Sequence, residues 1–163
     1  VTGEDAGMLR SVLLGAAAGA AGTTALNIAS YLDMLARGRP PSTTPERTAK
    51  VMAERAGIEV PGDDDVRSNR FTALGAMSGI AAGVGMGAVY GLAHGLGWRP
   101  SAWGGAGAAT VGALVGTNGP MTVLGVTDPR TWTAVDWVSD IVPHLAYGAV
   151  AAATYAAGAP RRF

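Results

Sequence analysis

The sequence predicts an all-α fold: a four-helix transmembrane bundle with glycine-zipper packing and a short amphipathic helix in the first loop. Three observations support this prediction. The 163-residue chain contains 25 glycines and is 48% hydrophobic. About half of its charged residues lie between Arg37 and Arg70. The remaining sequence divides into nearly uncharged segments of about 20 residues or more, the length that an α-helix needs to cross a bilayer. A soluble helical bundle is the alternative, but it would require charged helix faces.

A single transmembrane domain, residues 1–163, is expected to contain all four helices. We place these helices at residues 9–36, 71–97, 101–127 and 133–158, with a loop at 37–70. Tryptophans favour the headgroup level of a membrane, and they flank the last two connections: Trp98, Trp103, Trp132 and Trp137. A cleaved signal peptide is the alternative for the first helix. Glu4 and Asp5 argue against it, because a signal peptide begins with basic residues.

The distribution of basic residues predicts the orientation. Eight of the 12 Lys and Arg residues fall in the first and third connections. The opposite side carries Arg10, Arg99, Arg161 and Arg162. Short cytoplasmic loops are enriched in Lys and Arg. We therefore expect a multi-pass protein whose first loop is cytoplasmic and whose termini lie outside.

The first loop is the only long polar segment, and it is expected to contain one helix. This helix begins either with a capping box from Thr43 to Glu46 or with Thr44 as the cap before Pro45. It is expected to end near Ala56. Its apolar face, flanked by basic residues, predicts a helix that lies on the anionic leaflet or one that is solvated and folds back on the bundle. The acidic run at residues 63–65 is interpreted as a solvated turn.

A glycine ladder is the strongest packing signal in the sequence. The second long helix has glycine at every fourth position: Gly75, Gly79, Gly83, Gly87, Gly91 and Gly95. Residues four apart share one helix face, and small residues there allow two membrane helices to approach closely. The other long helices repeat this spacing more briefly. The extra small-residue faces either contact another subunit or are satisfied within one bundle.

Polar residues within the apolar segments form the second signal. Asp136, Asp140 and His144 follow one another at a spacing of four in the last helix. Asp136 is explained as part of a capping box with Thr133. Asp140 and His144 lie deeper, where ionisable groups usually face the bundle interior and suggest function.

Three further polar residues are predicted to meet Asp140 and His144: Asn27, Thr117 and Asn118. Gly119 and Pro120 are expected to break the third helix at this height and to free backbone groups. Broken helices near the midplane bind ions and substrates in transporters. The alternative is that these polar groups satisfy one another and stabilise the fold.

The sequence lacks the features of an enzyme. We find no nucleophile beside a base, no phosphate-binding loop and no basic surface for nucleic acid. Asp140 and His144 supply too few ligands for a structural metal site. The prediction is therefore a non-enzymatic protein with no cofactor and no metal.

Several short motifs carry a resemblance to known proteins. They are residues 27–33, 37–40 and 42–46, and later 118–122 and 140–144. With these motifs the chain resembles uncharacterised small membrane proteins of high-GC actinobacteria, and it is more distantly similar to YagU-like inner-membrane proteins. The resemblance implies a bacterial plasma membrane and transfers no catalytic or binding residue.

Two functions remain open from the sequence. The first is a membrane protein that acts by helix packing in the lipid bilayer, as a homo-oligomer or as an accessory subunit of a larger membrane complex. The second is a proton, ion or small-solute pathway built around Asp140, His144 and Asn118.

Overall fold

A computed structural model describes residues 3–159, and its side chains are described from residue 5. The residues it describes form five α-helices and one short 3-10 helix, with no β-strand: α1 Gly3–Arg37, α2 Thr44–Arg55, α3 Asp64–Gly95, α4 Ala102–Val123, η1 Pro129–Thr131 and α5 Ala134–Gly158. The prediction of an all-α fold is confirmed.

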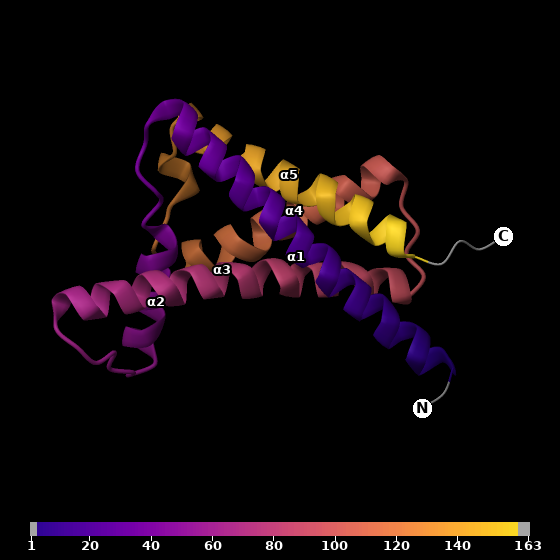
Figure 1. Cartoon of the computed structure of the whole chain (residues 1–163), viewed down its shortest axis with the longest axis horizontal. Helices are drawn as coiled ribbons and strands as arrows, with labels where there is room; N and C mark the ends of the chain where they lie inside the picture. Colours follow the sequence, from indigo (N-terminus) through magenta and orange to yellow (C-terminus); the bar gives the residue numbers. More distant parts are fainter. Residues whose placement is uncertain (1–2, 160–163) are drawn as a thin grey trace.

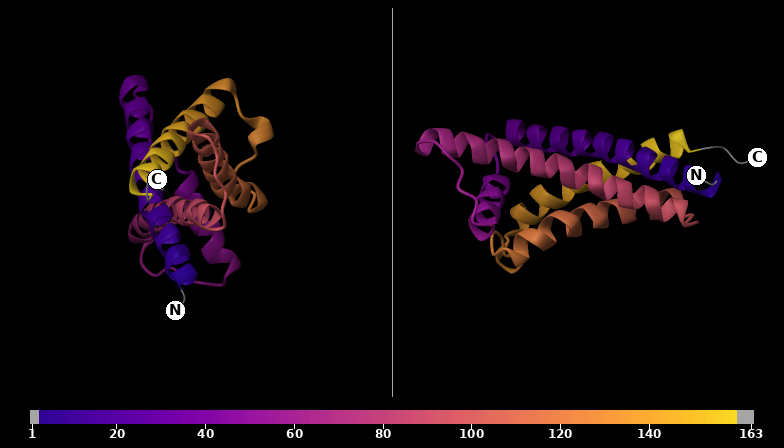
Figure 2. Two further views of the ribbon diagram at one scale, coloured as in Figure 1. Left: turned by 90° about the vertical axis from the view of Figure 1, so that its right-hand side faces the viewer. Right: turned by 90° about the horizontal axis from the view of Figure 1, so that it is seen from below.

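The four long helices pack side by side, and α2 covers one end of α3. Helix α1 packs against both α3 and α5, α5 also packs against α4, and α4 makes a smaller contact with α3. The chain ends lie at one end of this arrangement and the first loop lies at the other (Figure 1). Figure 2 shows α4 and α5 meeting near α2. We call that end, with residues 33–70 and 124–136, the charged end, and the opposite end the terminal end.

Side-chain caps explain where the helices begin. Asp63 accepts a 2.9 Å hydrogen bond from the backbone N–H of Val66, so α3 begins at Asp64 rather than at residue 71. Thr133 and Asp136 form the predicted capping box at the start of α5, which is confirmed. At its other end, α4 stops at Val123, before the predicted residue 127.

Helix α2 differs from its prediction at its N-terminus. Thr43 is the N-cap residue, but its side chain makes no cap hydrogen bond, so the predicted capping box with Glu46 is wrong. The Glu46 carboxylate instead accepts hydrogen bonds from Ser68 and Thr72 of α3, at 3.5 and 3.3 Å. The first turn of α2 is therefore held by α3. The helix ends at Arg55, close to the predicted position.

Two helices are long and apolar enough to cross a membrane by length and composition, at residues Asp5–Arg37 and Asp64–Gly95. A signal sequence or a buried core helix can meet the same criterion. Helices α4 and α5 do not meet it. Asn118 and Pro120 lower the hydropathy of α4, and Asp136, Asp140 and His144 lower that of α5. Four spans are therefore not established by composition.

The core is small and built largely from alanine and tyrosine. Its buried apolar side chains are Ala18, Phe71, Ala109, Ala113, Val126, Tyr147, Ala151 and Tyr155. Most leucine, isoleucine and valine side chains point outward instead. The helices consequently approach one another through small residues, and the large apolar groups form the exterior.

Candidate functional site

Four polar side chains meet where α4 packs on α5. Asn118 donates a 2.8 Å hydrogen bond from Nδ2 to Oδ2 of Asp140. One turn deeper, Oγ1 of Thr117 lies 3.2 Å from Nε2 of His144. The structure thus brings together Thr117, Asn118, Asp140 and His144, which we call the polar cluster. Asp140 and His144 lie four residues apart on one face of α5, and the adjacent residues Thr117 and Asn118 of α4 face them.

The His144 ring has a defined proton arrangement. Its Nδ1 lies 2.7 Å from the backbone carbonyl oxygen of Asp140, and a carbonyl only accepts, so Nδ1 carries a proton. In the neutral ring, Nε2 accepts from the Thr117 hydroxyl. In the charged ring, Nε2 donates, and the hydroxyl turns to the carbonyl oxygen of Ala113, at 2.9 Å. Protonation of His144 can therefore be accommodated without moving a helix.

The Asp140 carboxylate has no Lys or Arg partner among the described residues. The basic group beside it is His144, which is cationic only when its ring is protonated and whose Nδ1 lies 3.6 Å from Oδ1. The Asp140 side chain is 20% exposed and that of His144 only 9%. An isolated carboxylate in a low-dielectric setting is costly unless it is neutralised or paired. The arrangement is therefore chemically suited to hold a proton or to pair Asp140 with a charged His144.

Asn27 does not belong to the polar cluster, and its predicted place there is wrong. It is exposed on α1, and no hydrogen bond joins it to any other described residue. Asn27 continues the Gly15, Gly19 and Thr23 stripe at a spacing of four, so it faces the side of α3 rather than α4. Helices α1 and α3 diverge toward the charged end (Figure 1).

The predicted break in α4 is also absent. The helix continues through Gly119 and Pro120 to Val123, and the hydroxyl of Thr122 donates to the carbonyl oxygen of Asn118 at 2.7 Å. Proline removes one backbone donor but fits inside a helix where neighbouring groups compensate. The polar cluster therefore sits on continuous helices.

The glycine ladder divides between two neighbours. Gly83, Gly87, Gly91 and Gly95 face α1, and Gly75 faces the start of α2, where an added Cβ would lie 2.6 Å from the backbone carbon of Pro45. Gly79 has nothing within 4 Å of an added Cβ. The closest approach joins Gly87 and Gly91 to Gly15 and Gly19 of α1. The six glycines therefore do not share one role.

Tyr147 is a central residue that sequence reasoning missed. It is 1% exposed, and its hydroxyl donates a 2.7 Å hydrogen bond to the carbonyl oxygen of Gly83. Its ring lies over Gly22, where an added Cβ would be 2.8 Å from Cδ2. Tyr147 thus links α5 to α3 across α1. Its position three residues after His144, on the same face, was the available signal.

An aromatic cluster at the terminal end was also missed. The rings of Tyr90, His94 and Trp98, from α3 and its following turn, contact one another, and Tyr90 and His94 also contact Tyr155 of α5. The His94 and Tyr155 ring centroids lie 4.4 Å apart. Tyr90, His94 and Trp98 recur every four residues, which places them along one line. His94 is therefore half-buried among rings, with Nδ1 3.0 Å from the Tyr90 carbonyl oxygen.

Ion pairs gather at the charged end. Asp33 pairs with Arg37 and Arg39, and Arg37 also donates a 2.6 Å hydrogen bond to Ser139 of α5. In the connection between α4 and α5, the side-chain hydrogen bond from Arg130 holds the pKa of Asp128 below its ordinary value. Within residues 3–159 no group of three or more potential metal-binding side chains is present.

These features define an all-helical protein with two helices of membrane-spanning length and a polar contact between two further helices. Comparisons with protein-family models, with curated proteins and with solved structures gave no match.

Proposed function

We propose that the chain is a multi-pass plasma-membrane protein that acts by helix packing, either as a homo-oligomer or as an accessory subunit of a larger membrane complex. The observation that carries this proposal is a segment of α3 that no other described residue of the chain covers.

The exterior of the helices supports a membrane location. Only 28% of the apolar window of α1 and 17% of that of α3 is buried within the chain. A core helix of a soluble protein would be mostly buried. Polar groups such as His144, Thr110 and Thr23 lie inside instead. An apolar exterior around a partly polar interior is unfavourable in water and favourable in lipid.

We assign four spans because α4 and α5 belong to the same bundle as α1 and α3. At 22 and 25 residues, these helices extend about 33 and 38 Å at 1.5 Å per residue. Both exceed the hydrocarbon thickness of roughly 30 Å. Helix α4 has no charged residue, and of the two on α5, Asp136 lies at the charged end and Asp140 accepts a hydrogen bond from Asn118. By the positive-inside rule, the first loop is cytoplasmic and the termini lie outside.

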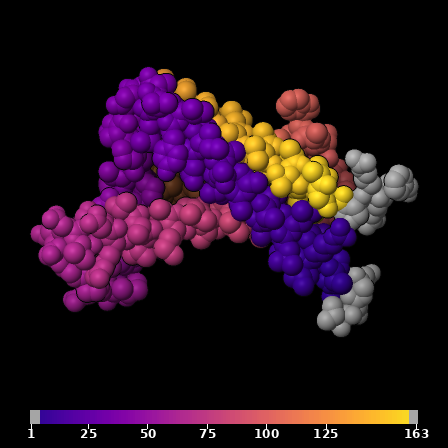
Figure 3. All heavy atoms as spheres, viewed as in Figure 1, coloured from indigo at the N-terminus to yellow at the C-terminus, as the bar shows by residue number. Residues whose placement is uncertain are grey.

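The exposed part of α3 supports a partner in the membrane. All six residues from Ala76 to Ala81 are exposed, and six consecutive residues cover every face of a helix. Met77 and Ile80 are 66% and 52% exposed. Helices α1 and α3 diverge toward the charged end beside this segment (Figure 3). A helix of a second chain fits here, because Gly79 offers a face without a side chain.

Crosslinking tests the packing role. The chain has no cysteine, so Ile80→Cys introduces a single reactive site in the uncovered segment, and Val142→Cys on α5 is the matched control. We expect the Ile80 variant to form a disulfide dimer or a crosslink to a co-purifying partner in native membranes. If neither variant forms a disulfide dimer or a crosslink to another protein under oxidising conditions, the packing role is refuted.

A second function is favoured by the polar cluster. Asp140 without a Lys or Arg partner, and His144 with two alternative hydrogen-bond states, are suited to a proton or ion pathway. The test is pH-dye flux in proteoliposomes with wild type and Asp140→Asn. Flux in wild type that the substitution removes would support the pathway. Wild-type flux no higher than that of empty liposomes would refute it.

A further inference from the structure

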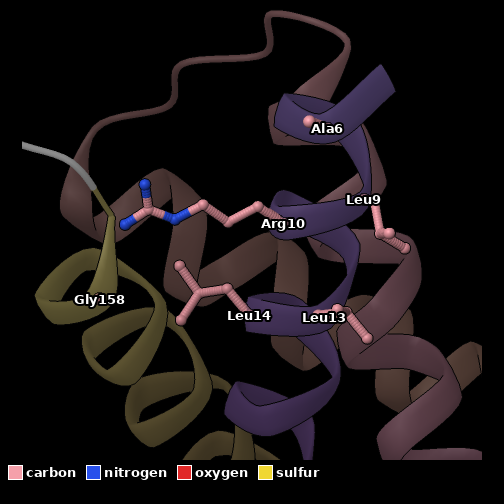
Figure 4. Close-up of a pocket in the computed structure, with 6 residues that line it drawn as sticks. All are labelled: Ala6, Leu9, Arg10, Leu13, Leu14 and Gly158. Atoms are coloured by element: carbon pink, nitrogen blue, oxygen red, sulfur yellow. The ribbon is translucent and has the colours of Figure 1, made fainter. Parts of the chain in front are cut away.

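A shallow apolar groove with one cation in its wall lies at the terminal end, between α1 and the last turn of α5. Its volume is about 610 Å³, within the roughly 300–1,000 Å³ typical of small-molecule sites. Figure 4 shows Arg10 extending from α1 toward the end of α5, with Leu14 beneath it. The lining is otherwise apolar: Ala6, Leu9, Leu13, Leu14 and Gly158.

Arg10 is unpaired in this groove. Its guanidinium makes no hydrogen bond or ion pair with any residue that the structure describes. It stands directly before the uncharged stretch of α1 from residue 11 to 32. In a membrane-spanning α1, this position lies at the headgroup level, with Leu13 and Leu14 one turn deeper.

We propose that the groove binds an anionic phospholipid, with its phosphate on Arg10 and one acyl chain along Leu14, which lies beneath Arg10 (Figure 4). This inference rests on the membrane location proposed above. A guanidinium binds phosphate oxygens through two parallel N–H donors, and the leucines supply the apolar wall that an acyl chain requires.

The charge of the surrounding sequence agrees with an anionic ligand. In the sequence, the four basic residues Arg10, Arg99, Arg161 and Arg162 on this side outnumber the two acids, Glu4 and Asp5. A free anion would leave the leucine wall unused, and in a zwitterionic lipid the headgroup's own ammonium competes with Arg10 for the phosphate.

Lipid retention measured by native mass spectrometry tests this site. The purified chain is offered equal amounts of phosphatidylglycerol and phosphatidylcholine in mild detergent. We expect wild type to retain phosphatidylglycerol with a preference of roughly fivefold, the effect of one basic residue near a lipid headgroup. Arg10→Gln should remove this preference. Ala6→Phe, which fills the groove and keeps the charge, should lower retention of both lipids.

Arg99→Gln is the matched control, because Arg99 lies at the same end and donates to the backbone carbonyls of His94 and Trp98 instead. This variant should keep the wild-type preference. An unchanged preference in Arg10→Gln, or an equal loss in Arg99→Gln, would overturn the site. Alkaline extraction of membranes tests the membrane location separately. If that location is wrong, the extraction releases the chain, whereas failure of the lipid site alone leaves the chain in the membrane.

Discussion

The crossing of α1 and α3 gives a quantitative prediction at Gly87. A Cβ added there would lie 2.3 Å from the carbonyl oxygen of Gly15 and 2.5 Å from Cα of Gly19. Ordinary contact begins near 3.4 Å, so Gly87→Ala must separate the two backbones by about 1 Å. Both neighbours are backbone atoms of a helix, so no flexible side chain can move aside.

The expected cost follows from this overlap. Adding atoms to a well-packed site costs about 1–3 kcal/mol. Separating two contacting helices by up to about 1 Å also loses a quarter to a half of the van der Waals energy of the contacts beside the new methyl group. Gly79→Ala is the matched control, because an added Cβ there meets nothing within 4 Å. Both substitutions gain the same helix propensity. The two variants should therefore differ by about 1–3 kcal/mol in free energy of unfolding.

The assay is SDS-induced unfolding in mixed micelles, followed by tryptophan fluorescence. Gly87→Ala should unfold at a lower SDS fraction than wild type or Gly79→Ala. Gly87→Leu should abolish the folded bundle, whereas Gly79→Leu should fold. Equal stability of the Gly87 and Gly79 variants would refute the reasoning, because it would mean that α1 and α3 do not cross at these glycines.

Three further predictions concern single contacts and the first loop. Tyr147→Phe should lower the free energy of unfolding by about 1 kcal/mol, since it removes the hydroxyl bond to Gly83 and keeps the ring; unchanged stability in the SDS assay would contradict that bond. Thr117→Val should change the NMR chemical shifts of the His144 ring nitrogens, because Nε2 loses its hydroxyl partner, and an unaltered spectrum would argue against the contact. Glu59→Cys should react with an impermeant maleimide only after the membrane is permeabilised, and labelling in intact cells would reverse the proposed orientation.

Much of the fold was predictable because its signals are local. Long uncharged stretches predicted the helices, and Thr133 with Asp136 predicted the start of α5. The exact start of α3 was not predicted, because the cap at Asp63 lies in an acidic run that was interpreted only as a turn. Glu46 was assigned to its own helix because its partners on α3 lie far away in the sequence.

The sequence predicted those residues of the candidate site whose positions depend only on helical spacing. Asp140 and His144 share one face of α5 because they are four residues apart, and their depth matches that of Asn118. Asn27 was misplaced because depth along a helix does not define the direction that a side chain faces. That direction depends on the crossing of α1 and α3, which brings Gly19 onto Gly87 and leaves Asn27 beyond the contact. Tyr147 was missed for a related reason: its partner is a backbone carbonyl.

The central claim is that α4 and α5, as well as α1 and α3, lie in the membrane. The most direct measurement is the reaction rate of single cysteines at Val115 of α4 and Val142 of α5 with a water-soluble maleimide, in membrane vesicles opened to both sides. Both positions are exposed in the isolated chain, at 63% and 50%, so only lipid or a partner chain can shield them. We predict that they stay unlabelled until detergent is added, while Glu59→Cys reacts at once. Rapid labelling of both positions without detergent would contradict the four-span account.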